Sequence, residues 1–290
     1  MNTASHRLPA LFIGHGNPMN ALASNEYTEA WRKLGDELKS RVRSVVIVSA
    51  HWATRDGLAV TTAERPGVLY DFFGFPDALS QVQYDCPGHP ELARHIQRRF
   101  SAFRAAGAQV PEVQGDPQRA LDHGVWSILT HMFPDADVPV VQLSYNMNTR
   151  AAGQIALGRA LVEDLSDQQA SDEDKFTNAS LRDQGVLLLT SGNIVHNLRE
   201  IDFDPHSPPH DWALEFDAAV QARLDQGPGE IDALLAPEDF GEAGRLAVPT
   251  LDHYIPFLNF LGMAASRDRF DYPCEGIQNR SISMRAVRCG

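Results

Sequence analysis

Four short apolar runs, separated by longer stretches of mixed polarity, constrain the fold of this chain more than any other feature. They begin at Leu8, Arg43, Val138 and Gly185, and the second, RSVVIVSA, has a continuous β-branched centre. Runs of this kind are typical of strands covered on both faces, as in a parallel sheet. The chain is therefore expected to build its core around such a sheet.

The stretches between the apolar runs have the residue spacing of helices. Helices are predicted at 26–39, 90–105, 151–165, 211–225 and 250–262, and further strands at 58–63 and 281–288. A helix between two buried strands is what a parallel crossover requires. The alternation predicts an α/β fold, a single domain over 1–290 with a mostly parallel central sheet flanked by helices. The polar stretch 166–183 is predicted to be a surface insertion.

Charge and composition exclude several classes of protein. A net charge of −13 argues against a nucleic-acid partner, because neutralising phosphates needs a basic face. No apolar run reaches the roughly 18 residues of a membrane span. The first residues lack a signal-peptide pattern, and the three cysteines match no disulfide framework or CxxC zinc motif. The chain is therefore predicted to be cytoplasmic, without membrane or nucleic-acid partners, and its oligomeric state is left open.

Five histidines stand near the ends of apolar runs or the starts of helices. They are His15 in LFIGHGNP, His51 in VVIVSAHW, His123 in LDHGVW, His196 in LTSGNIVHN and His253 in PTLDHYIPF. Imidazole is the commonest protein metal ligand, and it titrates near neutral pH. Open α/β sheets bind ligands outside the carboxyl ends of their strands. If their strands are parallel neighbours, His15 and His51 form the start of a divalent-metal site.

Four of these histidines, all but His196, also have an ordinary structural explanation, which for His51 is that of an isolated core histidine. His15 lies between two glycines and fits a tight turn, and His123 fits the first turn of a helix. His253 precedes Phe257 by four residues and fits the inward face of a helix. Taken singly, each of these four is compatible with either role.

Six segments follow one another along the chain: LFIGHGNPMNAL, VVIVSAHW, YDFFGFP, LDHGVWSILTHMFPDADVPVVQLS, LTSGNIVHNL and DHYIPFLNFLG. Together they resemble the class III extradiol ring-cleavage dioxygenases, and within them the 4,5-DOPA dioxygenase extradiol branch. The resemblance runs from about Leu8 to the C-terminus and is broken mainly at 166–183.

This resemblance implies a metal site and a reaction pair. It gives the five histidines separate roles, with His15, His51 and His253 as metal ligands, His196 as an acid/base, and His123 beside substrate and oxygen. The wider class uses a carboxylate as third ligand, so the third position stays open between His253 and Asp252. His196 is also a candidate fourth ligand of a tetrahedral zinc site.

The implied activity is ring opening of a catechol such as DOPA by O₂ with non-haem Fe(II), and Zn(II) is a candidate metal for the isolated protein. The aromatic residues of YDFFGFP either line the substrate site or pack within their own loop: Tyr70, Phe72, Phe73 and Phe75. Two other functions stay open. One is a zinc hydrolase, for which the HExxH motif is missing, and the other is a non-enzymatic binding protein on the same scaffold.

Overall fold

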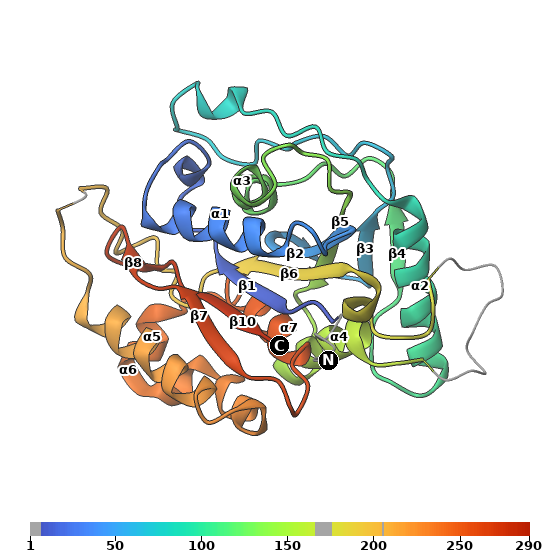
Figure 1. Cartoon of the computed structure of the whole chain (residues 1–290). Helices are drawn as coiled ribbons and strands as arrows, with labels where there is room; N and C mark the ends of the chain where they lie inside the picture. Colours follow the sequence, from blue (N-terminus) through green and yellow to red (C-terminus); the bar gives the residue numbers. More distant parts are fainter. Residues whose placement is uncertain (1–6, 166–175, 205) are drawn as a thin grey trace, which may run out of the picture.

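An eight-stranded sheet with helices on both faces forms the centre of the computed structural model (Figure 1), which describes residues 7–165, 176–204 and 206–290. The strands of this sheet are β1 (Ala10–Gly14), β2 (Ser44–Thr54), β3 (Leu58–Thr61), β4 (Val113–Asp116), β5 (Val140–Asn146), β6 (Val186–Gly192), β7 (Phe270–Cys274) and β10 (Ala286–Cys289). A separate small sheet pairs β8 (Ile277–Gln278) with β9 (Ile282–Ser283).

The strand order across the large sheet is β4-β3-β5-β2-β6-β1-β10-β7. The four central strands, β5, β2, β6 and β1, are parallel to one another. At one side β10 and β7 add antiparallel strands, and at the other β3 pairs antiparallel with β5. The predicted mostly parallel α/β fold is confirmed.

Helices cover both faces of the sheet. They are α1 (Glu26–Leu38), α2 (Pro90–Ala105), α3 (His123–Met132), α4 (Ala151–Val162), α5 (Asp211–Leu224), α6 (Gly241–Ala247) and α7 (Ile255–Gly262). One face carries α1 and α3, and the other carries α4 and α7 (Figure 1). The start of α1 is set locally, because the Asn25 side chain accepts hydrogen bonds from the backbone of Tyr27 and Thr28.

Two hydrophobic cores lie on opposite faces of the sheet, and the alternation of side chains along each strand supplies both. In β2, Val46 and Val48 belong to the core beneath α4 and α7, whereas Val45 and Ile47 belong to the core beneath α1 and α3. Successive strand residues point to opposite faces. A strand buried on both faces therefore has a continuous apolar run, which is the pattern found in the sequence.

Several predicted boundaries were wrong. The helix predicted at 250–262 begins only at Ile255, so His253 lies in the turn before it. The strand predicted at 281–288 is divided into β9 and β10. The sequence patterns also missed the short β4 and β7 at the two edges of the sheet, because an edge strand needs no continuous apolar run.

The predicted surface insertion at 166–183 is wrong at its C-terminal end. Residues 166–175 lie outside the described residues, but Ser180, Leu181 and Arg182 are buried. The Arg182 guanidinium donates to three backbone carbonyls and to Asp268, so its buried charge is fully partnered. Among the described helices, none has the length and apolar character needed to cross a membrane.

Candidate metal centre and active site

The site lies at the carboxyl edge of the parallel strands. His15 directly follows β1, and His51 lies near the end of β2. The two strands are parallel but not direct neighbours, which was the condition for the predicted divalent-metal site, because β6 lies between them. All three strands run in the same direction, so their carboxyl ends still meet at one edge. The two imidazoles therefore lie close together although their strands do not touch.

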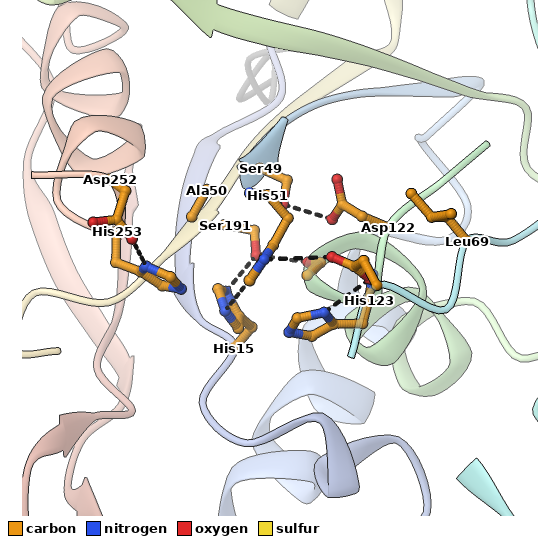
Figure 2. Close-up of polar contacts among 12 residues, drawn as sticks. His15, Ser49, Ala50, His51, Leu69, Asp122, His123, Ser191, Asp252 and His253 are labelled. Atoms are coloured by element: carbon orange, nitrogen blue, oxygen red, sulfur yellow. Dashed lines mark hydrogen bonds and ion pairs between the residues drawn. The ribbon is translucent and has the colours of Figure 1, made fainter. Parts of the chain in front are cut away.

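An irregularity in β2 positions His51. The pairing of β2 with β5 shifts register between Val48 and Ala53, while β2 continues to Thr54. This irregular stretch of β2 carries His51, and irregularities of this kind redirect side chains near the ends of strands. Figure 2 shows the His51 ring pointing toward His15.

His253 reaches the same place from the turn before α7. Its backbone carbonyl accepts a 2.9 Å hydrogen bond from the backbone N–H of Asn193, just beyond β6. A Cβ atom at Gly192 would lie 2.3 Å from that carbonyl oxygen, so only glycine allows this approach. Residues at the end of β6 therefore anchor the turn that carries His253.

Three histidines form a compact group of candidate metal ligands. His15, His51 and His253 each offer a ring nitrogen, and these nitrogens all lie within 4.8 Å of one another. The Nε2 atoms of His15 and His51 are 3.1 Å apart. The ring centre of His253 is 5.2 Å from that of His15 and 5.0 Å from that of His51.

The Nδ1 atom of each of these rings contacts a side chain outside the three-histidine group, which we call an outer partner. Nδ1 of His15 lies 2.9 Å from Oγ of Ser191, whose own proton goes to the Gly124 carbonyl at 2.6 Å. Ser191 must therefore accept from His15, which leaves the proton on Nδ1 and the lone pair on Nε2. Nδ1 of His253 faces Asp252 at 2.5 Å (Figure 2), and Nδ1 of His51 faces Asp71 at 3.4 Å.

This arrangement fits a divalent cation. Metal-binding histidines usually donate their second ring N–H to a carboxylate or another oxygen, which aims the opposite nitrogen at the metal. The two Nε2 lone pairs of His15 and His51, 3.1 Å apart, repel each other unless a cation or a proton lies between them. Asp252 is not in the three-histidine group but in a second group of candidate ligands with His196 and His253, and its contact with Nδ1 of His253 is that of an outer partner.

His123 and His196 lie on either side of this group. His123 begins α3, and its ring centre is 3.9 Å from that of His51. Its Nδ1 lies 3.0 Å from Oδ1 of Asp71, which also accepts the His123 backbone N–H. The His196 ring stacks on His253 at 3.5 Å with an angle of 9° between the planes. The structure thus brings all five predicted histidines into one continuous cluster.

Burial keeps most of these imidazoles neutral. Burial, together with the neighbouring histidines, lowers the pKa of His15 well below its usual range and that of His51 to about 3. Burial also lowers the pKa values of His196 and His253 to about 4, against the opposing effect of Asp252. Neutral imidazole is the form that binds metals and accepts protons.

These shifts predict that the metal-free protein loses stability in mild acid. Unfolded histidine has a pKa near 6.5, whereas His51, His196 and His253 titrate at about 3 to 4 in the fold. The unfolded chain therefore binds more protons below pH 6.5, and the stability present above that pH falls as the pH drops. Each group contributes up to about 1.4 kcal/mol per pH unit in this window.

Thermal melting of the chelator-treated protein between pH 7.5 and 5.0 measures this effect, since the carboxylates titrate mainly below that range. His196→Gln should make the dependence of Tm on pH shallower. A melting temperature that stays constant from pH 7 to 5 would contradict the assignment.

A cavity of about 350 Å³ opens onto the histidine cluster, and all five histidines line it. Its volume is within the range of small-molecule sites, roughly 300–1,000 Å³. Phe72, Phe73 and Phe75 also line it, so most of the expected aromatic wall is present. Tyr70 is not among the described lining residues, and its hydroxyl donates to the Val82 carbonyl at 2.7 Å.

Two residues that hold the histidines were missed in the sequence. Asp71 contacts both His51 and His123, and its acidic position within YDFFGFP was the available signal. Burial alone would raise the pKa of Asp71, but its hydrogen bond and charge interaction with His123 hold it at about 2. Ser191, which fixes the His15 ring, carried no signal, because serine is common after a buried strand.

Comparisons with known proteins agree with this geometry. The family described as the catalytic LigB subunit of aromatic ring-opening dioxygenase matches residues 4–252, a match that ends one residue before His253. The chain is 41% identical to a 4,5-DOPA dioxygenase extradiol of Escherichia coli K12, over 99% of this chain and 96% of that protein. A 4,5-DOPA dioxygenase extradiol of Beta vulgaris is 33% identical, over 89% of this chain and 87% of that one.

A solved structure has the same fold. It is the crystal structure of an uncharacterized protein of Escherichia coli K12, which is 40% identical and superposes with a TM-score of 0.77. The similarity covers 98% of this chain and 100% of that one. Family match, relatives and fold confirm the resemblance drawn from the six motifs. The chain belongs to the LigB family of aromatic ring-opening dioxygenases and is an extradiol dioxygenase.

Proposed function

We propose that this enzyme uses Fe(II) and O₂ to open the ring of a catechol, the class of compound that includes DOPA. The observation that carries the proposal is the convergence of His15, His51 and His253 at the cavity, with each Nδ1 atom facing a partner outside this group. We also propose that 1–290 form a single catalytic domain, because the large sheet takes strands from both ends of the chain. A cytoplasmic location stays a prediction from the sequence.

His15, His51 and His253 are the proposed metal ligands, and Asp252 is the proposed outer partner of His253. Fe(II) held by these three histidines would supply the redox chemistry that allows a catechol to react with O₂. An all-nitrogen set also suits Zn(II), which is the proposed occupant when the protein is isolated without added iron.

His196 is the proposed acid/base. Its ring is neutral near pH 7, because burial lowers its pKa to about 4, so a ring nitrogen can accept the proton of a catechol hydroxyl. His196 then returns that proton as the catechol ring opens between a hydroxylated and an unsubstituted carbon. Both atoms of O₂ enter the product, a carboxylate that also carries an aldehyde. The stacking of the His196 ring on His253 supports the acid/base role of His196 over that of a fourth metal ligand.

His123 is proposed to hydrogen-bond O₂ or a substrate hydroxyl. Asp71 holds Nδ1 of His123 and its backbone N–H, so the opposite nitrogen, Nε2, is left for the cavity. The ring is therefore oriented before substrate arrives. Preorganised polar groups of this kind need no rearrangement during the reaction.

Asp71→Asn tests this positioning. The variant keeps the shape of the side chain but loses the charge and one acceptor, so the rings of His123 and His51 are held less firmly. We expect kcat to fall by about 10- to 100-fold, the usual cost of losing an outer partner at a metal site. Asp135→Asn, which removes only an exposed ion pair with Lys39, is the matched control and should retain the wild-type rate.

The function itself is tested by loading the protein with Fe(II) under nitrogen and then measuring oxygen uptake with a panel of catechols. Uptake of one O₂ per catechol, with the yellow absorbance of a ring-opened product, is expected. The Zn(II)-loaded protein should bind catechol without consuming O₂. No uptake with any catechol by the iron-loaded protein would favour the zinc hydrolase or the binding protein instead.

A further inference from the structure

The cavity has two chemically different ends. Its inner end is formed by the five histidines, which can bind a metal and hydroxyl groups. The remaining wall is mainly apolar and comes largely from two segments of chain, with Phe72, Phe73 and Phe75 in one and Leu198, Ile201 and Phe203 in the other. A catechol whose hydroxyls meet the histidines must therefore direct the rest of its structure along apolar side chains.

The described residues that form this wall carry no charged side chain. Among the described residues that line the cavity, none is Lys, Arg, Asp or Glu, and Asn17 is the one polar side chain besides the histidines. A neighbouring cavity of about 370 Å³ shares Asn17 and Phe203 with it, and the charged residue among its described lining is Asp204, an acid. Among the described lining residues of either cavity, a substrate carboxylate would find no cation.

This absence of a cation matters for the side chain of DOPA. A carboxylate that loses water in an apolar cavity without a partner is strongly disfavoured. The net charge of −13 adds a general repulsion of anions. Asp204 can pair only with the ammonium group of DOPA. The carboxylate of the same molecule therefore stays unpaired.

The mouth of the cavity exposes large apolar side chains. Phe73, Phe203 and Leu198 are 94%, 63% and 61% exposed, and they are the three most exposed large apolar side chains among the described residues. All three line the cavity. Clustered exposure of this kind marks a surface that binds an apolar partner. Here the partner must fit a cavity of small-molecule size.

We propose that the substrate of this enzyme is a catechol with an uncharged apolar substituent, alkyl or aryl, and that DOPA is a poor substrate. The inference rests on the proposed function, because it assumes that catechol hydroxyls bind at the histidine end. The substituent covers Phe73, Leu198 and Phe203, and its affinity comes from removing their apolar surface from water.

Binding and turnover test the proposal separately. Dissociation constants are measured by calorimetry on the Fe(II)-loaded enzyme under nitrogen, where no O₂ is available, for 4-methylcatechol, 4-butylcatechol, 4-phenylcatechol, dopamine, 3-(3,4-dihydroxyphenyl)propionate and DOPA. Each methylene added to the alkyl series should tighten binding by about fourfold, and 4-butylcatechol should bind at least about tenfold more tightly than DOPA. Oxygen uptake should give the same order in kcat/KM.

A substitution that places a cation at the mouth of the cavity tests whether the enzyme then binds an anionic catechol more tightly. Leu198→Arg should weaken the binding of 4-butylcatechol and strengthen the binding of the anionic 3-(3,4-dihydroxyphenyl)propionate. The ratio of their dissociation constants should change by about tenfold. Leu214→Arg is the matched control, since Leu214 is 49% exposed on α5 and does not line the cavity. It should leave the ratio unchanged.

The outcomes separate this inference from the proposed function. DOPA that binds and turns over as well as 4-butylcatechol would overturn the inference and leave the dioxygenase proposal intact. Tighter binding of the apolar catechols without oxygen uptake would support the inference about the cavity and overturn the proposed reaction. An unchanged ratio in Leu198→Arg would also overturn the inference.

Discussion

His196→Gln is expected to lower kcat by about 10²- to 10⁴-fold, the usual contribution of a general acid/base. Glutamine keeps a polar group of similar reach but neither accepts nor returns a proton near neutral pH. His196 lies outside the group formed by His15, His51 and His253, so the variant should keep its metal. Oxygen uptake with a catechol, together with metal content by mass spectrometry, measures both effects.

His206→Gln is the matched control for this variant, because His206 is exposed and does not line the cavity. It should retain wild-type kcat. If His196→Gln keeps full turnover, His196 is not the acid/base. If it loses its metal together with its activity, His196 is a ligand, as in the tetrahedral zinc arrangement.

The identity of the third ligand is decided by comparing His253→Gln with Asp252→Asn. His253→Gln is expected to abolish stable metal binding and turnover, because it removes one of three nitrogens that converge within 4.8 Å. Asp252→Asn removes only the acceptor at Nδ1 of His253, so metal affinity should fall by about 10- to 100-fold and activity should return with excess Fe(II).

Titration of the chelator-treated variants with Fe(II) under nitrogen gives both affinities. The opposite order, with Asp252→Asn unable to hold metal and His253→Gln able to, would identify Asp252 as the ligand. That result would match the carboxylate found in the wider class and would contradict the geometry of this site.

The fold was predictable where local patterns carry the information. Continuous apolar runs indicated β1, β2, β5 and β6, because a strand buried on both faces has no polar side to present. The edge strands β4 and β7 have mixed composition and were missed. The start of α7 was misplaced for a similar reason, since the residues before it are apolar enough to continue a helical pattern but form turns.

Residue types and their order along the chain determined the family and the five histidines of the site, because imidazoles near run ends are visible without any knowledge of folding. Only the tertiary structure decided how those histidines are held. Ser191 is 176 residues from His15, and Asp71 is 52 residues from His123, so neither contact leaves a trace in local spacing.

The same is true of the cavity. Its two apolar walls, 72–75 and 198–203, are more than a hundred residues apart in the chain, and each alone resembles an ordinary loop. Short-range patterns report only which residues face the core. Which side chains meet across the carboxyl edge of the sheet depends on strand order, and here β6 lies between the strands that carry His15 and His51.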